Sequence, residues 1–254
     1  MEDKEIRQRE IYRFVEHYFW DHENPLLMIR NSRLYQEGYD AYGLSDEELR
    51  QIKYQVLDKF ELSPLELAEL GTIFIRTGKF EFGSLAILLL KKHRPRLTRE
   101  IFEIVSTWFD KGVENWSHCD LLATKILPVC LELGIATLED FESWRTKESK
   151  WARRAAILTL IYLIRNGAEP QSLLDFTEPL MKDRERQVQQ ALGRFLSKLK
   201  ENHPEIVEEF LHTHKTRIPR LLNGSTEPAP KPEQQKKKKK FHPRPKRAGK
   251  PDKS

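Results

Sequence analysis

Apolar residues recur at three- and four-residue intervals along most of the chain as far as Leu222, which is the spacing of one face of an α-helix. Serine, threonine, proline and glycine mark where these segments start and stop: Ser63-Pro64 suits a cap and first turn, Gly78 an end, and Thr98 a new start. The pattern predicts helices at 63–77, 80–93, 98–110, 117–133, 149–165, 170–182, 184–201 and 204–212. No segment has the two-residue alternation of a strand, so we expect an all-α fold.

The predicted helices also repeat along the chain. Similar apolar segments place alanines at positions 86, 123, 156 and 191, which are 37, 33 and 35 residues apart. A small residue lets neighbouring helices approach closely, and helix pairs with a period of about 35 to 45 residues are typical of α-solenoids. We therefore expect a HEAT-like α-solenoid of stacked antiparallel helix pairs, whose concave face holds an extended partner. An irregular or globin-like bundle is the alternative.

The character of the sequence changes after Leu222, where proline and lysine become frequent and apolar residues almost vanish. Residues 223–254 carry eleven Lys and Arg against three acids, a balance of +8, and residues 1–222 carry 33 against 36, a balance of −3. We expect a helical domain at 1–222 and a disordered tail at 223–254. The lysine run Lys236–Lys240 could bind nucleic-acid phosphates without recognising the base sequence. A solubility tail, or an arm that contacts RNA or the ribosome, is an equal alternative.

Composition narrows the range of functions. Cys119 and Cys130 offer neither a disulfide framework nor a pair of metal ligands, and no metal-binding, phosphate-loop or nucleophile-elbow motif is present. We expect no metal and no cofactor. The charged start lacks the apolar run of a secretory signal, and the longest apolar stretches fall short of a membrane span. We expect a cytoplasmic monomer that does not enter a membrane.

Trp116 and Asp120 stand four residues apart and would share one face of a helix. Two interpretations are open. Ser117 and Asp120 have the spacing of a capping box, with Trp116 as a core residue before it. Alternatively, the indole and the carboxylate together form a site. The spacing alone favours the capping box.

A second segment, Trp151 to Leu158, follows the most basic stretch of the domain. Arg154 lies three residues after Trp151, and arginine donates paired hydrogen bonds to phosphate. Positive charge at the start of a helix opposes the helix dipole, which favours a functional role over a solvated helix start. A third segment runs from Asp183 to Arg194 and contains Val-Gln-Gln-Ala-Leu-Gly.

Taken in order, Trp-x-x-x-Asp, Trp-x-x-Arg-x-Ala-Ile-Leu and Val-Gln-x-Ala-Leu-Gly resemble the DNA alkylation repair family of AlkD-type DNA glycosylases, over roughly residues 60–212. The resemblance implies a HEAT-like solenoid with Trp116 and Asp120 as the catalytic pair and Arg154 at the concave face. One position departs from the pattern. Arg194 stands where active members of the family carry a second active-site tryptophan.

The resemblance implies excision of N3- or N7-alkylated purines from double-stranded DNA, with Asp120 stabilising positive charge on the sugar and Trp116 packing against it. The expected DNA contacts are Arg154, Arg194, Trp151, Arg145, Lys150 and Lys198. Because of Arg194, a non-catalytic binder of damaged or branched DNA stays open. A HEAT-type scaffold that holds a peptide is the third possibility, favoured if the concave face is acidic.

Overall fold

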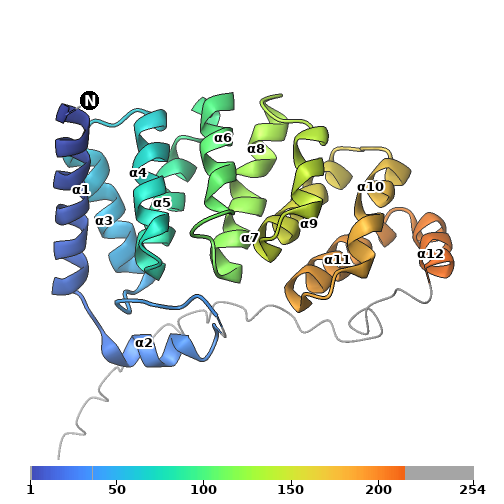
Figure 1. The fold of residues 1–254 in the computed structure, drawn as a ribbon, viewed down its shortest axis with the longest axis horizontal. Helices are drawn as coiled ribbons and strands as arrows, with labels where there is room; N and C mark the ends of the chain where they lie inside the picture. Colours follow the sequence, from blue (N-terminus) through green and yellow to red (C-terminus); the bar gives the residue numbers. More distant parts are fainter. Residues whose placement is uncertain (1, 36, 215–254) are drawn as a thin grey trace, which may run out of the picture. The chain divides into compact units, whose positions relative to one another are not determined.

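The computed structural model describes residues 2–35 and 37–214, and this part of the chain forms α-helices and short 3₁₀ helices (Figure 1). The α-helices are α1 (Glu2–Asp21), α2 (Pro25–Ser32), α3 (Asp46–Lys59), α4 (Pro64–Arg76), α5 (Phe80–Lys92), α6 (Arg99–Trp108), α7 (Trp116–Lys125), α8 (Leu127–Glu132), α9 (Lys150–Arg165), α10 (Pro170–Thr177), α11 (Arg186–Lys200) and α12 (Pro204–Thr213). The 3₁₀ helices are η1 (Arg94–Arg96), η2 (Glu139–Thr146) and η3 (Glu178–Lys182). The prediction of a tail at 223–254 lies outside the described residues.

The helices pack in pairs that follow one another along the chain (Figure 1). α4 contacts both its partner α5 and the first helix of the next pair, α6. The second helices α5, α7, α9 and α11 contact one another in sequence and form a continuous row. The expected all-α architecture of stacked helix pairs is confirmed.

Side-chain caps set several helix starts where the sequence predicts them. Ser63 accepts a hydrogen bond from the backbone N–H of Glu66, whose carboxylate accepts from Ser63 N–H in return, so α4 begins with a full capping box. Thr98 and Ser149 cap α6 and α9 in the same way, although without the reciprocal acid. Gly78 adopts a positive φ of 72° directly after α4, which is the backbone conformation that glycine tolerates best.

Three predicted boundaries are wrong, each for a local reason. α7 begins at Trp116 because Asn115, and not Ser117, provides the cap; its side chain accepts from the N–H of His118. The single helix predicted at 117–133 breaks at Ile126 into α7 and α8, because Pro128 has no N–H to continue the helical hydrogen bonds and its ring crowds the preceding turn. Pro179 similarly converts the end of the helix predicted at 170–182 into the 3₁₀ turn η3.

The repeated alanines lie in the buried interior of the second helices α5, α7, α9 and α11. Ala86, Ala123, Ala156 and Ala191 are all completely buried, so each accommodates a neighbouring helix without a gap. Close approach between pairs also explains Gly71, where an added Cβ would lie 2.7 Å from the ring of Trp108. Small residues at these positions therefore let neighbouring helices pack closely, both within the pairs and between them.

The N-terminal segment was not predicted in detail. The connection from α2 to α3 is held in place by a side chain on α5. Glu81 on α5 is buried and accepts hydrogen bonds from the backbone N–H groups of Tyr42, Gly43 and Leu44 at 2.8–3.2 Å. A carboxylate that accepts several backbone N–H bonds is well satisfied even when buried. None of the helices in the described part of the chain has the length and hydrophobicity that crossing a membrane requires.

Candidate functional site

Asp120 is placed by α7 at the centre of a network of charged side chains. Because Asn115 caps the helix, Asp120 does not form the capping box that its spacing suggested. Its carboxylate instead turns toward α9 and α11, where it meets Arg154 and Arg194. The two interpretations of this segment are thereby separated, and the capping role is wrong.

Arg154 holds Asp120 through two parallel hydrogen bonds. Arg154 Nε donates to Asp120 Oδ1 at 2.7 Å, and Arg154 Nη2 donates to Oδ2 at 2.9 Å. The remaining terminal nitrogen, Nη1, donates to the backbone carbonyl of Gln187 at 2.6 Å, which ties α9 to α11. Such a bidentate pair fixes the orientation of the carboxylate plane.

Arg194 completes the network from α11. Its Nη1 donates to Asp120 Oδ2 at 2.8 Å, so this oxygen accepts hydrogen bonds from both arginines. Arg194 differs from Arg154 in burial, because 45% of its side chain is exposed against 4%. One carboxylate facing two guanidinium groups leaves a local charge of +1.

Burial and pairing act in opposite directions on Arg154. Desolvation disfavours the charged guanidinium, but the paired carboxylate of Asp120 outweighs it, so the pKa of Arg154 is raised. The guanidinium is therefore charged at every accessible pH. The neighbouring thiol of Cys119 is buried, and desolvation raises its pKa well above the usual range, which makes it unreactive.

Trp116 lies at the first position of α7, one helical turn before Asp120, as the spacing predicts. It is half-buried, and the ring of Tyr35 stacks against it with centroids 5.3 Å apart and planes 13° from parallel. Its indole N–H points toward the backbone carbonyl of Leu34 at 3.4 Å. One face of the indole is thus covered by the connection between α2 and α3.

The other expected DNA contacts differ in how far they are exposed and in what they contact. Lys150 and Lys198 remain partly exposed, but each pairs with an acid: Lys150 with Glu37 and Lys198 with Glu201. Trp151 is buried and packs in the core, which does not support a direct contact with DNA.

Arg145 lies on η2 and not on the row of second helices. It donates to the carbonyl of Phe176 on α10 at 3.4 Å and stacks over its ring. Its guanidinium therefore packs against α10, and its expected contact with DNA stays a prediction.

Three residues that the sequence did not single out also belong to this neighbourhood: Tyr35, Glu37 and Gln187. Each meets the site through a contact between distant parts of the chain, as with Gln187, whose carbonyl receives Arg154. No local motif marks such residues. The one local feature that could have pointed to a stacking cluster is the four-residue spacing of Tyr35 and Tyr39, whose rings are parallel.

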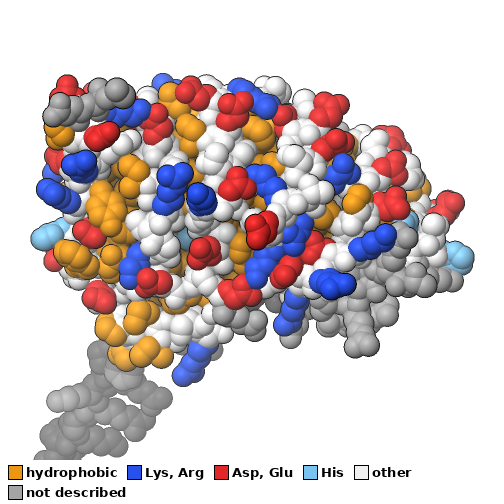
Figure 2. Space-filling view, in the orientation of Figure 1, with side chains coloured by type: hydrophobic (Ala, Val, Ile, Leu, Met, Phe, Trp, Pro, Cys, Tyr) orange, Lys and Arg blue, Asp and Glu red, His pale blue; other side chains and the backbone are white. Residues whose placement is uncertain are grey.

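The surface around the network carries both signs of charge. Lys and Arg side chains gather over the lower ends of α7, α9 and α11 with Asp and Glu side chains among them (Figure 2). Within the described residues, no group of His, Cys, Asp and Glu is arranged to hold a metal ion. The site therefore presents one oriented carboxylate, that of Asp120, one helical turn from the indole of Trp116 and in contact with the half-exposed Arg194.

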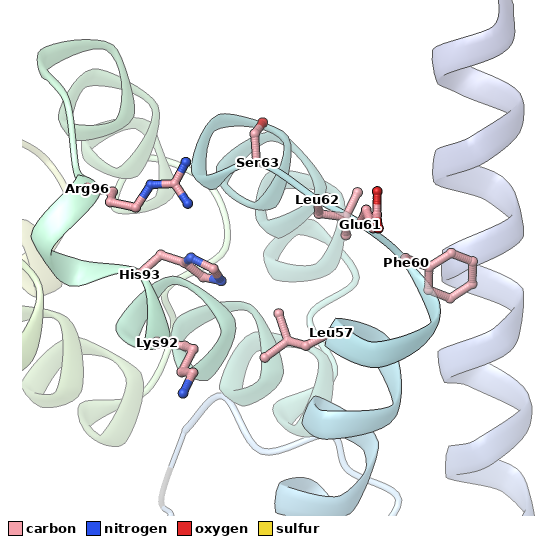
Figure 3. Close-up of a pocket in the computed structure, with 8 residues that line it drawn as sticks. All are labelled: Leu57, Phe60, Glu61, Leu62, Ser63, Lys92, His93 and Arg96. Atoms are coloured by element: carbon pink, nitrogen blue, oxygen red, sulfur yellow. The ribbon is translucent and has the colours of Figure 1, made fainter.

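A pocket of about 430 Å³ lies elsewhere, between the end of α3, the start of α4 and the end of α5 (Figure 3). Leu57, Phe60 and Leu62 form its apolar side, and Lys92, His93 and Arg96 approach from the other side. None of the residues around Asp120 lines it. The carboxylate network is therefore separate from this pocket.

Comparison with known proteins identifies a family and similar folds. The DNA alkylation repair enzyme family matches residues 15–223. A solved structure described as a predicted DNA alkylation repair enzyme from Enterococcus faecalis is similar, with a TM-score of 0.64 and 17% identity, covering 78% of this chain and 95% of that one. The structure of smu.31 from Streptococcus mutans UA159 has a TM-score of 0.53 and 16% identity, over 78% and 96%. No curated protein matches the sequence.

At these identities the two structures establish a shared fold, while the family match extends over most of the chain. The expected resemblance is therefore confirmed. The protein belongs to the DNA alkylation repair enzyme family, and this membership supports a role in DNA repair.

Proposed function

We propose that the protein is a DNA glycosylase that excises N3- or N7-alkylated purines from double-stranded DNA, with Asp120 as the catalytic carboxylate. The observation that carries the proposal is the placement of Asp120. Its carboxylate is fixed in a bidentate pair by Arg154, is partly exposed, and lies one turn of α7 from Trp116.

The chemistry requires little beyond a fixed negative charge. A purine alkylated at N7 or N3 is already cationic and leaves without a general acid. Cleavage of its bond to the sugar builds positive charge on the deoxyribose, which a nearby carboxylate stabilises. Asp120 would also orient the attacking water, and the indole of Trp116 would pack against the sugar and favour the developing cation.

Arg194 has two consequences for this reaction. While it donates to Asp120 Oδ2, it offsets the charge that the transition state needs. Because its side chain is half exposed, it can leave the carboxylate and donate to a DNA phosphate. We propose that productive binding includes this exchange. Lys150 and Lys198 would supply further phosphate contacts.

A second candidate is a non-catalytic binder of damaged or branched DNA on the same scaffold. The contact between Arg194 and Asp120 specifically favours it, because a site with a local charge of +1 attracts phosphate and lacks an unpaired carboxylate. In that case Asp120 serves to orient two arginines.

Release of free base separates the two candidates. Purified wild type and Arg194→Trp are incubated with duplex DNA carrying 7-methylguanine or 3-methyladenine, and the free bases are measured. The glycosylase proposal predicts release by wild type and faster release by Arg194→Trp, because the tryptophan restores a packing surface and frees Asp120. Tight binding of branched DNA without base release by either protein would establish the binding function instead.

A further inference from the structure

The connection between α2 and α3 places a carboxylate among the expected DNA contacts. Glu37 Oε2 pairs with the ammonium group of Lys150, and Glu37 Oε1 accepts a hydrogen bond from Gln187 Nε2 at 3.2 Å. Lys150 starts α9 and Gln187 lies in the first turn of α11, so Glu37 reaches across from the N-terminal part of the chain to both. Gln187 is also the residue whose carbonyl receives Arg154.

The same connection covers the indole that the reaction would use. Tyr35 stacks on Trp116, and Tyr35 and Tyr39 are themselves parallel with centroids 4.8 Å apart. The backbone carbonyl of Gly38, just before Tyr39 in the sequence, accepts a hydrogen bond from Asn115 Nδ2 at 3.4 Å. A single short segment therefore contacts both the aromatic and the cationic side of the site.

The two ends of this connection are held differently. At residues 42–44 the buried carboxylate of Glu81 binds three successive backbone N–H groups, which anchors the segment to α5. At residue 37 the contacts are between partly exposed side chains, with 48% of Glu37 and 22% of Lys150 accessible. Exposed ion pairs are weak and exchange readily with other ions. The outer contact can therefore break while the anchor stays in place.

We propose that Glu37 forms an autoinhibitory contact, in which its carboxylate occupies the place of a DNA phosphate on Lys150 and Gln187. This inference rests on the proposed DNA-binding function of the site. Carboxylate and phosphate oxygens accept the same hydrogen bonds from ammonium and amide groups. A bound duplex replaces Glu37 with a phosphate, and loss of this contact removes one restraint on the segment whose Tyr35 covers Trp116. Access to the indole is thereby linked to occupancy of the phosphate position.

Glu37→Gln tests the competition, and Glu185→Gln is its matched control. Glu185 also approaches Lys150, at 3.8 Å, but belongs to the start of α11 and not to the covering segment. Both variants remove one negative charge beside the same lysine. We expect Glu37→Gln to bind an undamaged duplex about three- to fivefold more tightly than wild type, in line with the loss of a competing exposed ion pair, and Glu185→Gln to change much less. Equal effects of the two variants on duplex affinity would mean that Glu37 acts only through its negative charge near Lys150, and this would overturn the proposal.

A reversible crosslink tests the movement itself. The natural cysteines are buried, so Glu37→Cys with Gln187→Cys can be joined selectively by a short thiol crosslinker that a reductant cleaves. Lys150 stays intact in this variant. We expect the joined form to bind duplex at least about tenfold more weakly than the same protein after cleavage. Unchanged affinity on cleavage, in a protein that binds duplex, overturns the inference alone. Absence of duplex binding by wild type and every variant instead removes the proposed function with it.

Discussion

Arg154 and Arg194 hold the same carboxylate but depend on it to different degrees. Arg154 is almost completely buried and uses three of its nitrogens for hydrogen bonds within the protein, whereas Arg194 is half exposed and uses one. Removing one partner of a buried ion pair leaves an uncompensated charge and unsatisfied acceptors. An exposed partner is replaced by water at little cost.

The same substitution at both positions should therefore have unequal effects on stability. Arg154→Met should lower the free energy of unfolding by about 3 kcal/mol or more, because Asp120 and the carbonyl of Gln187 lose a buried donor. Arg194→Met should lower it by less than about 1 kcal/mol. Urea denaturation of the two variants measures the difference, and equal losses would contradict the distinction in burial on which the account of the site depends.

Sequence reasoning predicted the members of this network but not its connections. Four-residue spacing correctly placed Trp116 and Asp120 on one helix. It could not show that Arg194 donates to Asp120, because the two residues are 74 positions apart and meet only through the packing of α7, α9 and α11. The pairing of Lys150 with Glu37 was equally inaccessible, since it joins residues 113 positions apart.

The helix starts that the sequence predicted best are those with a single capping side chain. Ser63, Thr98 and Ser149 are single strong capping residues at the edge of an apolar pattern, and each caps the expected helix. At α7 two capping residues compete, and Asn115 prevails over Ser117 because its side chain also donates to the Nδ1 of buried His118. A local rule cannot rank two good caps when tertiary contacts decide between them.

His118 joins α5 to α7 and carries a pH dependence. Its Nε2 lies 3.0 Å from both the hydroxyl of Ser84 and the carbonyl of Phe80, which identifies the Nε2–H tautomer of a neutral ring. Complete burial lowers its pKa to about 4, although the hydrogen bond to Phe80 partly opposes the shift. An added Cβ at Gly83 would lie 2.4 Å from the ring, so the imidazole fills the space between the helices.

Acid should therefore weaken the contact between α5 and α7. The unfolded chain protonates His118 near pH 6.5 and the folded chain only near pH 4, so the unfolded state binds more protons between these values and stability falls as pH decreases. We expect about 2 kcal/mol of this loss between pH 7 and pH 5. Urea denaturation should show a shallower pH dependence for His118→Gln than for wild type, with His17→Gln, at an exposed position, as the control. If His118→Gln leaves the pH dependence of stability unchanged, another group is responsible for that dependence.

At the scale of the whole molecule, charge is divided unevenly along the chain. Residues 1–222 have a balance of −3 and residues 223–254 a balance of +8. The cations around Asp120 are also largely offset by acids, so local geometry and not net charge distinguishes the site. Affinity for DNA of any sequence should consequently depend on the C-terminal residues.

Removal of residues 223–254 should weaken binding to undamaged duplex and flatten the dependence of the binding constant on salt concentration, because fewer counterions are released. Excision at low salt should largely survive, since none of the proposed site residues lies there. Binding measured over a range of salt concentrations gives the slope. A slope unchanged by truncation would mean that these residues do not contact DNA.

The central claim is that Asp120 stabilises the transition state of base excision, and Asp120→Asn tests it most directly. The variant is compared with wild type in single-turnover release of 7-methylguanine from duplex DNA. Asp110→Asn serves as the control, because Asp110 also pairs with a cation, Lys147, but lies outside the network. The account predicts that Asp120→Asn releases base roughly a hundredfold more slowly while binding DNA at least as tightly as wild type. Wild-type release by a normally folded Asp120→Asn would contradict it.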